Sequence, residues 1–107
     1  MQRLTPVELS VWLSDPHRTK PVMLDVREPW EFQLGHIDGS THIPMASIPA
    51  RLSDLDPDLE TVVICHHGAR SYQIASFLEQ RGFGKLYNLE TGLDGWARTV
   101  DPAMATY

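Results

Sequence analysis

Apolar residues fall into short continuous runs separated by stretches with helical spacing, and this alternation predicts the fold class. Four runs are typical of short, mostly buried strands, at positions 22–26, 41–43, 61–65 and 86–89. A capping box at Thr5-Pro6-Val7-Glu8 predicts a helix before the first of them, and an amphipathic helix is expected from Ser71 to Arg81 after the third. We therefore expect an α/β fold with a central, mostly parallel sheet and helices on both faces.

Proline and glycine mark the remaining elements. Residues 28–32 predict a short helix entered through proline, with Gly35 at its end. One or two short helical pieces are expected over 46–55. A final helix is expected over 92–98, although its two glycines weaken it by propensity alone.

Length and composition favour a single small domain. The chain has 107 residues, of which 42% are hydrophobic, and we expect one domain over 1–107 with one core. The formal net charge of −5 argues against nucleic acid or an anionic membrane as the main partner. No apolar run approaches the roughly 20 residues that span a bilayer.

The single cysteine, Cys65, is the strongest candidate for chemistry. It follows a predicted buried strand and precedes a predicted helix, so it lies where parallel α/β sheets bind ligands. Free N–H groups of the turn and of the helix start favour negative charge there, and Arg70 adds a permanent positive charge. Gly68 allows a tight turn and a close approach of substrate to the backbone. These features predict a nucleophilic thiolate.

Cys65 allows two other interpretations. An unpaired cysteine at the end of a strand is often an inert core residue. A metal cluster of Cys65, His66 and His67 lacks the separated ligands that zinc requires, so we expect no metal and no cofactor. One cysteine cannot form an internal disulfide, and an exposed reactive thiol survives best in a reducing compartment. With no N-terminal leader visible, we expect a cytoplasmic protein.

Three polar residues are expected to support the site. Asp25 interrupts a predicted buried strand, and a carboxylate there needs a partner such as Arg27. We expect both residues to anchor structure near the site rather than to react. His36 and His42 lie beside apolar residues and are more often structural histidines than general bases.

Four motifs in order resemble a single rhodanese domain of the sulfurtransferase family over nearly the whole chain. They are Leu24-Asp25-Val26-Arg27-Glu28-Pro29-Trp30-Glu31-Phe32, Gly35-His36-Ile37-Asp38-Gly39-Ser40-Thr41-His42-Ile43-Pro44, Val63-Ile64-Cys65-His66-His67-Gly68-Ala69-Arg70-Ser71 and Tyr87-Asn88-Leu89-Glu90-Thr91-Gly92-Leu93-Asp94-Gly95-Trp96. Two small departures occur: His42 stands where the family commonly has Asn, and Ser40 where it often has Ala.

The resemblance implies a reaction and its residues. Cys65 would take the outer sulfur of thiosulfate or a related donor, release sulfite and hold the sulfur as a persulfide. An acceptor such as cyanide, a thiol or a thioredoxin-like dithiol would then remove it. Backbone N–H groups of the loop would bind the charged sulfur, and Arg70 would bind the anionic donor. The substrate-binding residues implied in this way are His66, His67, Gly68, Ala69 and Arg70, with structural support from Asp25, Arg27 and His36.

Three alternatives use similar residues. A phosphatase or arsenate reductase of the related fold resembles Cys-x5-Arg, whereas four residues separate Cys65 from Arg70, and the shorter loop suits a single sulfur atom. A non-catalytic regulatory module is disfavoured because the cysteine is present. A persulfide carrier fed by a partner protein needs the same loop, so the sequence does not separate it from a thiosulfate enzyme.

Overall fold

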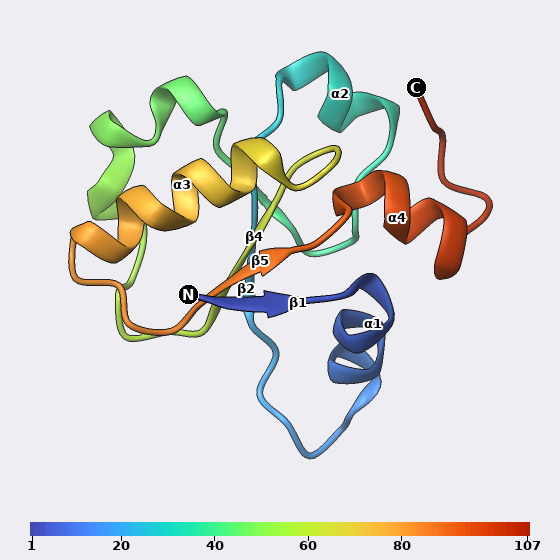
Figure 1. Cartoon of the computed structure of the whole chain (residues 1–107), viewed down its shortest axis with the longest axis horizontal. Helices are drawn as coiled ribbons and strands as arrows, with labels where there is room; N and C mark the ends of the chain where they lie inside the picture. The colour runs from blue at the N-terminus through green and yellow to red at the C-terminus, as the bar shows by residue number, and fades with distance from the viewer.

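The computed structural model describes residues 1–107 and is built around a five-stranded, all-parallel sheet (Figure 1). The strand order is β1-β5-β4-β2-β3. The strands are β1 (Gln2–Leu4), β2 (Val22–Asp25), β3 (Thr41–His42), β4 (Thr61–Ile64) and β5 (Leu86–Leu89). The predicted α/β class with a central parallel sheet is confirmed.

Three α-helices and two 3₁₀ segments connect the strands, and a fourth α-helix follows the last strand. They are α1 (Pro6–Ser14), α2 (Pro29–Leu34), η1 (Met45–Ser47), η2 (Pro49–Asp54), α3 (Ala69–Gln80) and α4 (Gly92–Thr99). The capping box is confirmed, because the Glu8 amide donates to Thr5 Oγ1 at 3.2 Å and the Thr5 amide donates to Glu8 Oε1 at 2.9 Å. None of the helices combines the length and apolar character needed to cross a membrane.

Apolar clusters cover both faces of the sheet. One face packs against α3 and the 3₁₀ segments, and the other against α1 and α4 (Figure 1). Side chains along β4 and the residue after it alternate between the two faces of the sheet. Val62 and Ile64 point toward α1 and α4, whereas Val63 and Cys65 point toward α3. The strand pattern therefore fixes the side of the sheet on which the thiol lies.

One strand was missed by the prediction, and one helix begins earlier than predicted. Strand β1 was not predicted, because three residues with one buried side chain carry no readable periodicity; it forms through backbone pairing with β5. Helix α3 begins at Ala69 rather than Ser71. Gly68, with φ of 105°, reverses the direction of the chain in a single residue, and the helix starts immediately after it.

Candidate functional site

The loop from Cys65 to Gly68 joins the central strand β4 to the start of α3. The amide of Gly68 donates to Cys65 Sγ at 3.0 Å, so the turn folds back on its own cysteine. The first N–H groups of α3 follow directly, and such groups have no acceptor within a helix. The loop therefore directs one backbone donor at the sulfur atom and places the unpaired amides of the helix start next in the chain.

The Cys65 thiol is part of a closed ring of hydrogen bonds. Its S–H donates to Ser71 Oγ at 3.3 Å, and the Ser71 hydroxyl donates to the side-chain oxygen of Asn88. The Asn88 amide then donates to the carbonyl of Gly68 at 3.2 Å, and the Gly68 amide completes the ring at the sulfur. Ser71 is fully buried and Asn88 largely so, which shields the ring from water.

Cys65 is only 1% exposed, which differs from the exposed thiol expected from the sequence. The alternation of β4 turns the side chain inward against residues of the α3 face such as Val63 and Ile74. The site is therefore closed in this conformation.

Arg70 forms a two-pronged ion pair with Glu31 of α2. The two guanidinium nitrogens lie 2.7 and 2.9 Å from the two carboxylate oxygens. These hydrogen bonds from Arg70, outweighing the effect of burial and helped by Tyr107, lower the pKa of Glu31 to about 2. The Glu31 side chain is 4% exposed and that of Arg70 35%. The positive charge of Arg70, expected to bind an anionic sulfur donor, is thus already paired with the Glu31 carboxylate.

Asp25 and Arg27 form a second, fully buried ion pair next to the first. Arg27 Nη2 lies 2.8 Å from Asp25 Oδ2, and both side chains are 1% exposed. The same guanidinium donates to the carbonyls of Glu31 and Gly35, at 3.2 and 2.8 Å. This pair holds α2 in place and so positions the carboxylate that binds Arg70.

Tyr107 covers the loop from the far end of the chain. Its hydroxyl donates to Glu31 Oε2 at 2.6 Å and accepts from Arg27 Nη1 at 3.1 Å. Its ring stacks on His66 with centroids 4.0 Å apart, and it meets Trp30 edge-on at 5.3 Å. Burial, followed by the hydrogen bond to Glu31, raises the pKa of Tyr107, so the hydroxyl remains a donor at neutral pH.

The four histidines that the sequence singled out divide into two groups. His66 and His67 lie in the loop with ring centroids 4.0 Å apart, and burial followed by the nearby His67 lowers the pKa of His66. His36 is exposed, stacks on Phe32 at 3.7 Å and hydrogen-bonds its carbonyl. His42 lies 2.8 Å from the carbonyl of Arg27. The contacts of His36 and His42 are thus with α2 and the Arg27 backbone.

Helix α4 packs its N-terminus against the back of the loop. The amides of Leu93 and Asp94 donate to the carbonyls of Cys65 and His66, at 2.9 and 3.0 Å. Gly92 has φ of 56°, and a Cβ there would come within 2.4 Å of both of these carbonyl oxygens. Only glycine fits, which explains why a helix of poor propensity begins there.

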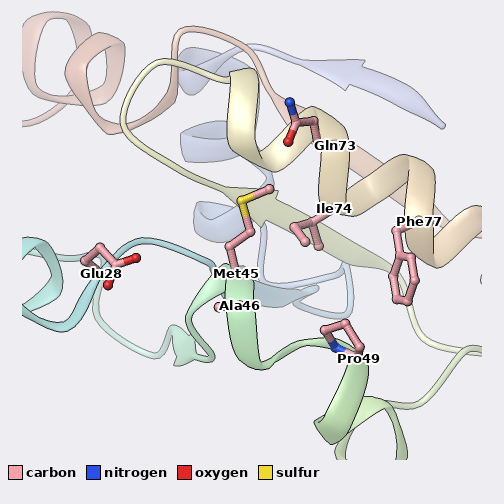
Figure 2. A pocket seen from close by; sticks show the side chains of 7 residues that line it. All are labelled: Glu28, Met45, Ala46, Pro49, Gln73, Ile74 and Phe77. Atoms are coloured by element: carbon pink, nitrogen blue, oxygen red, sulfur yellow. The ribbon is translucent and has the colours of Figure 1, made fainter.

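An apolar groove of about 500 Å³ lies between α3 and η1, beside the site rather than at the cysteine (Figure 2). Figure 2 shows Met45 and Ile74 facing each other across it, with Glu28 and Gln73 toward one end. Its lining does not include Cys65. In the closed conformation the groove therefore offers no path to the sulfur.

Four residues of the site were not singled out from the sequence as functional, and they are Glu31, Ser71, Asn88 and Tyr107. Ser71 carried a usable signal, because a serine in the first turn of a helix directly after a strand-end cysteine faces that cysteine. The pairing of Glu31 with Arg70 joins positions 39 apart and gives no local pattern.

Comparisons with known proteins identify the family. Residues 6–99 match the Rhodanese-like domain family. The chain is 39% identical over 84 residues to a protein named sulfurtransferase from Allochromatium vinosum. The aligned region covers 78% of each of the two chains. The chain is also 40% identical over 81 residues to the thiosulfate sulfurtransferase GlpE of Pseudomonas aeruginosa. That alignment covers 76% of this chain and 73% of GlpE.

Solved structures share the fold as well. The crystal structure of a rhodanese-like domain protein from Staphylococcus aureus superimposes with a TM-score of 0.83 at 30% identity, over 100% of this chain and 99% of the other. A rhodanese-related protein from Thermoplasma volcanium gives the same score at 29% identity, over 94% of each chain. The chain belongs to the rhodanese-like sulfurtransferase family.

Proposed function

We propose that the chain moves a sulfane sulfur from thiosulfate or a related donor to a thiol or cyanide, with Cys65 as the carrier of the sulfur. The observation that carries the proposal is the contact of 3.0 Å between the Gly68 amide and Sγ of the only cysteine, at the carboxyl end of a central parallel strand.

The proposed reaction has two half-reactions. In the first, the Cys65 thiolate attacks the outer sulfur of thiosulfate, a sulfur–sulfur bond forms, and the bond to the sulfite group breaks with its electron pair leaving on sulfite. In the second, an acceptor thiolate or cyanide attacks the outer sulfur of the persulfide, and Cys65 leaves as thiolate. Each half-reaction conserves charge and needs no outside oxidant or reductant, and the two together predict ping-pong kinetics.

Backbone donors of the loop support an anionic sulfur at this position. The Gly68 amide already reaches Sγ, and the amides of Ala69 and Arg70 at the start of α3 lack acceptors within the helix. Amide dipoles that are fixed before the reaction stabilise developing charge without a cost of reorganisation. The Ser71 hydroxyl can turn from Asn88 toward a deprotonated sulfur and add another donor.

Donor binding must open the closed site. An anion that reaches Arg70 has to compete with Glu31 for the guanidinium, and Tyr107 must release the loop before the sulfur is accessible. We infer that thiosulfate binding and loop opening are coupled, since Glu31 is the partner of both Arg70 and Tyr107.

The length of the loop favours sulfur transfer over phosphate chemistry. Four residues separate Cys65 from Arg70, and the Gly68 amide points directly at the sulfur, which leaves a narrow ring rather than a cup for a tetrahedral oxyanion. As acceptor we propose a small or protein thiol, such as a thioredoxin-like dithiol. A free thiol is retained best in a reducing compartment, so we propose the cytoplasm as the location.

Two-substrate kinetics test this proposal. Formation of thiocyanate from thiosulfate and cyanide is measured over a grid of both concentrations, for the wild type and for Cys65→Ser. We expect parallel double-reciprocal lines for the wild type and no turnover above background for a variant that retains the wild-type circular dichroism spectrum. Turnover by Cys65→Ser refutes the mechanism. Sulfur acceptance from a protein persulfide without any turnover of thiosulfate favours the carrier alternative.

A further inference from the structure

Three metal-ligating side chains converge on the outer side of the Cys65 loop. The potential ligand atoms of His66, His67 and Asp94 all lie within 4.8 Å of one another. His67 Nε2 is 3.8 Å from Asp94 Oδ2. Ligand atoms around a tetrahedral zinc ion lie about 3.3 to 3.5 Å apart, as metal–ligand distances of about 2.0 to 2.2 Å require. A closure of about an ångström would therefore bring the three into range.

The His66 ring stacks on Tyr107, but none of the hydrogen bonds in the structure uses a ring nitrogen of either imidazole. The only fully buried side-chain nitrogen or oxygen atom without a hydrogen bond is Nδ1 of His66. Buried polar atoms are almost always paired, so an orphaned one calls for an unseen partner such as an ion or water. The His67 side chain is 68% exposed, with Asp94 3.8 Å from its Nε2 atom and the His66 ring beside it, so it has room to rotate onto an ion.

The backbone already holds the three ligands together. The Asp94 amide donates to the carbonyl of His66 at 3.0 Å, and this bond fixes the start of α4 against the loop. The one competitor for the carboxylate is Arg98, whose Nη2 lies 3.0 Å from Asp94 Oδ2. Because the Arg98 side chain is 65% exposed, this ion pair contributes little and a divalent cation can displace it.

We propose that His66, His67 and Asp94 form a binding site for a divalent transition-metal ion of the Zn²⁺ class, with water in the fourth position. Two imidazoles and one carboxylate suit Zn²⁺, Ni²⁺ or Cu²⁺ and not Mg²⁺ or Ca²⁺, which take oxygen ligands. The metal cluster weighed from the sequence used Cys65 as its third ligand; here the third ligand comes from α4. The site uses no sulfur atom and is independent of the sulfur-transfer proposal.

Calorimetric titration with Zn²⁺ on untagged protein tests the site. The Cys65→Ser background removes binding to the thiol, and in it we expect one equivalent of Zn²⁺ to bind. His67→Ala and Asp94→Asn should each weaken binding about tenfold or more, since loss of outer-sphere partners alone costs that much. His17→Ala, which removes an exposed histidine in the turn after α1, is the matched control and should bind as the background does.

A gain of affinity provides the second arm. Arg98→Gln frees the Asp94 carboxylate, and we expect it to strengthen Zn²⁺ binding about threefold or more. Co²⁺ should give the visible absorption of a tetrahedral site in the Cys65→Ser protein, without a sulfur-to-metal band. The proposal is overturned if no saturable binding occurs, if His67→Ala binds as the control does, or if wild-type protein binds Zn²⁺ only through Cys65.

Discussion

Replacing Glu31 with glutamine tests the ion pair that closes the site. The carboxylate receives hydrogen bonds from Arg70, from the Tyr107 hydroxyl and from the Glu28 amide at 3.0 Å, and it is almost fully buried. Glutamine keeps the size of the side chain, removes its charge and replaces one of the two accepting oxygens with a donating NH2 group. Like protonation, the substitution therefore removes both the negative charge and one hydrogen-bond acceptor.

The magnitude follows from the pKa of Glu31. It is lowered from its ordinary value of 4.5 to about 2, and each tenfold change in proton affinity corresponds to about 1.4 kcal/mol. The ionised carboxylate thus stabilises the folded chain by about 3 kcal/mol. Because the folded-state pKa lies below the unfolded one, this contribution is complete above about pH 5.5 and is lost as the pH falls toward 2. At pH 3 the stabilisation by the Glu31 carboxylate is smaller by about 2 kcal/mol than at pH 7.

Urea unfolding followed by tryptophan fluorescence measures the effect at pH 7 and pH 3. We expect Glu31→Gln to lower the free energy of unfolding by about 3 kcal/mol at pH 7. At pH 3 the difference in free energy of unfolding between the wild type and the variant should be smaller by about 2 kcal/mol. Asp58→Asn, at an exposed turn, is the matched control and should change stability by less than about 0.5 kcal/mol. A gap that is the same at both pH values, or no larger than that of the control, refutes the reasoning.

Three further substitutions probe the loop and its cover. Tyr107→Ala removes the stack on His66 and the hydrogen bond to Glu31, so alkylation of Cys65 by iodoacetamide should become about three- to tenfold faster; an unchanged rate would show that Tyr107 does not limit access. Ser71→Ala removes the side-chain partner of the Cys65 sulfur and should slow sulfur transfer about fivefold or more, with the thermal midpoint lowered by the loss of a buried hydrogen bond; full activity would exclude Ser71 from the reaction. Gly92→Ala forces a Cβ against two loop carbonyls and should destabilise the fold by about 3 kcal/mol or more in urea unfolding; wild-type stability would mean that α4 is free to shift away from the loop.

The fold could be predicted because its signals are local. The apolar runs and the Thr5 capping box each specify their own segment, and the structure follows them. Strand β1 escaped prediction because its formation depends on pairing with β5 and not on its own side chains.

The site could be predicted only in part, because several of its contacts join distant segments. The sequence could place Cys65, Gly68 and Arg70 in one strand-to-helix loop, since all three lie within six residues. It could not show that Arg70 is paired with Glu31, or that Tyr107 lies over His66. The alternation along β4 already turns the Cys65 side chain inward, but how completely it is covered depends on the packing of α3 and the loop around it.

Intact-mass measurement after incubation with thiosulfate tests the central claim most directly. The account predicts that wild-type protein gains the mass of one sulfur atom, that peptide analysis assigns it to Cys65, and that cyanide then removes it with release of thiocyanate. Cys65→Ser should gain nothing. A wild-type protein whose mass stays unchanged with thiosulfate and with every other sulfane sulfur donor, while its thiol remains available to iodoacetamide, would contradict the account.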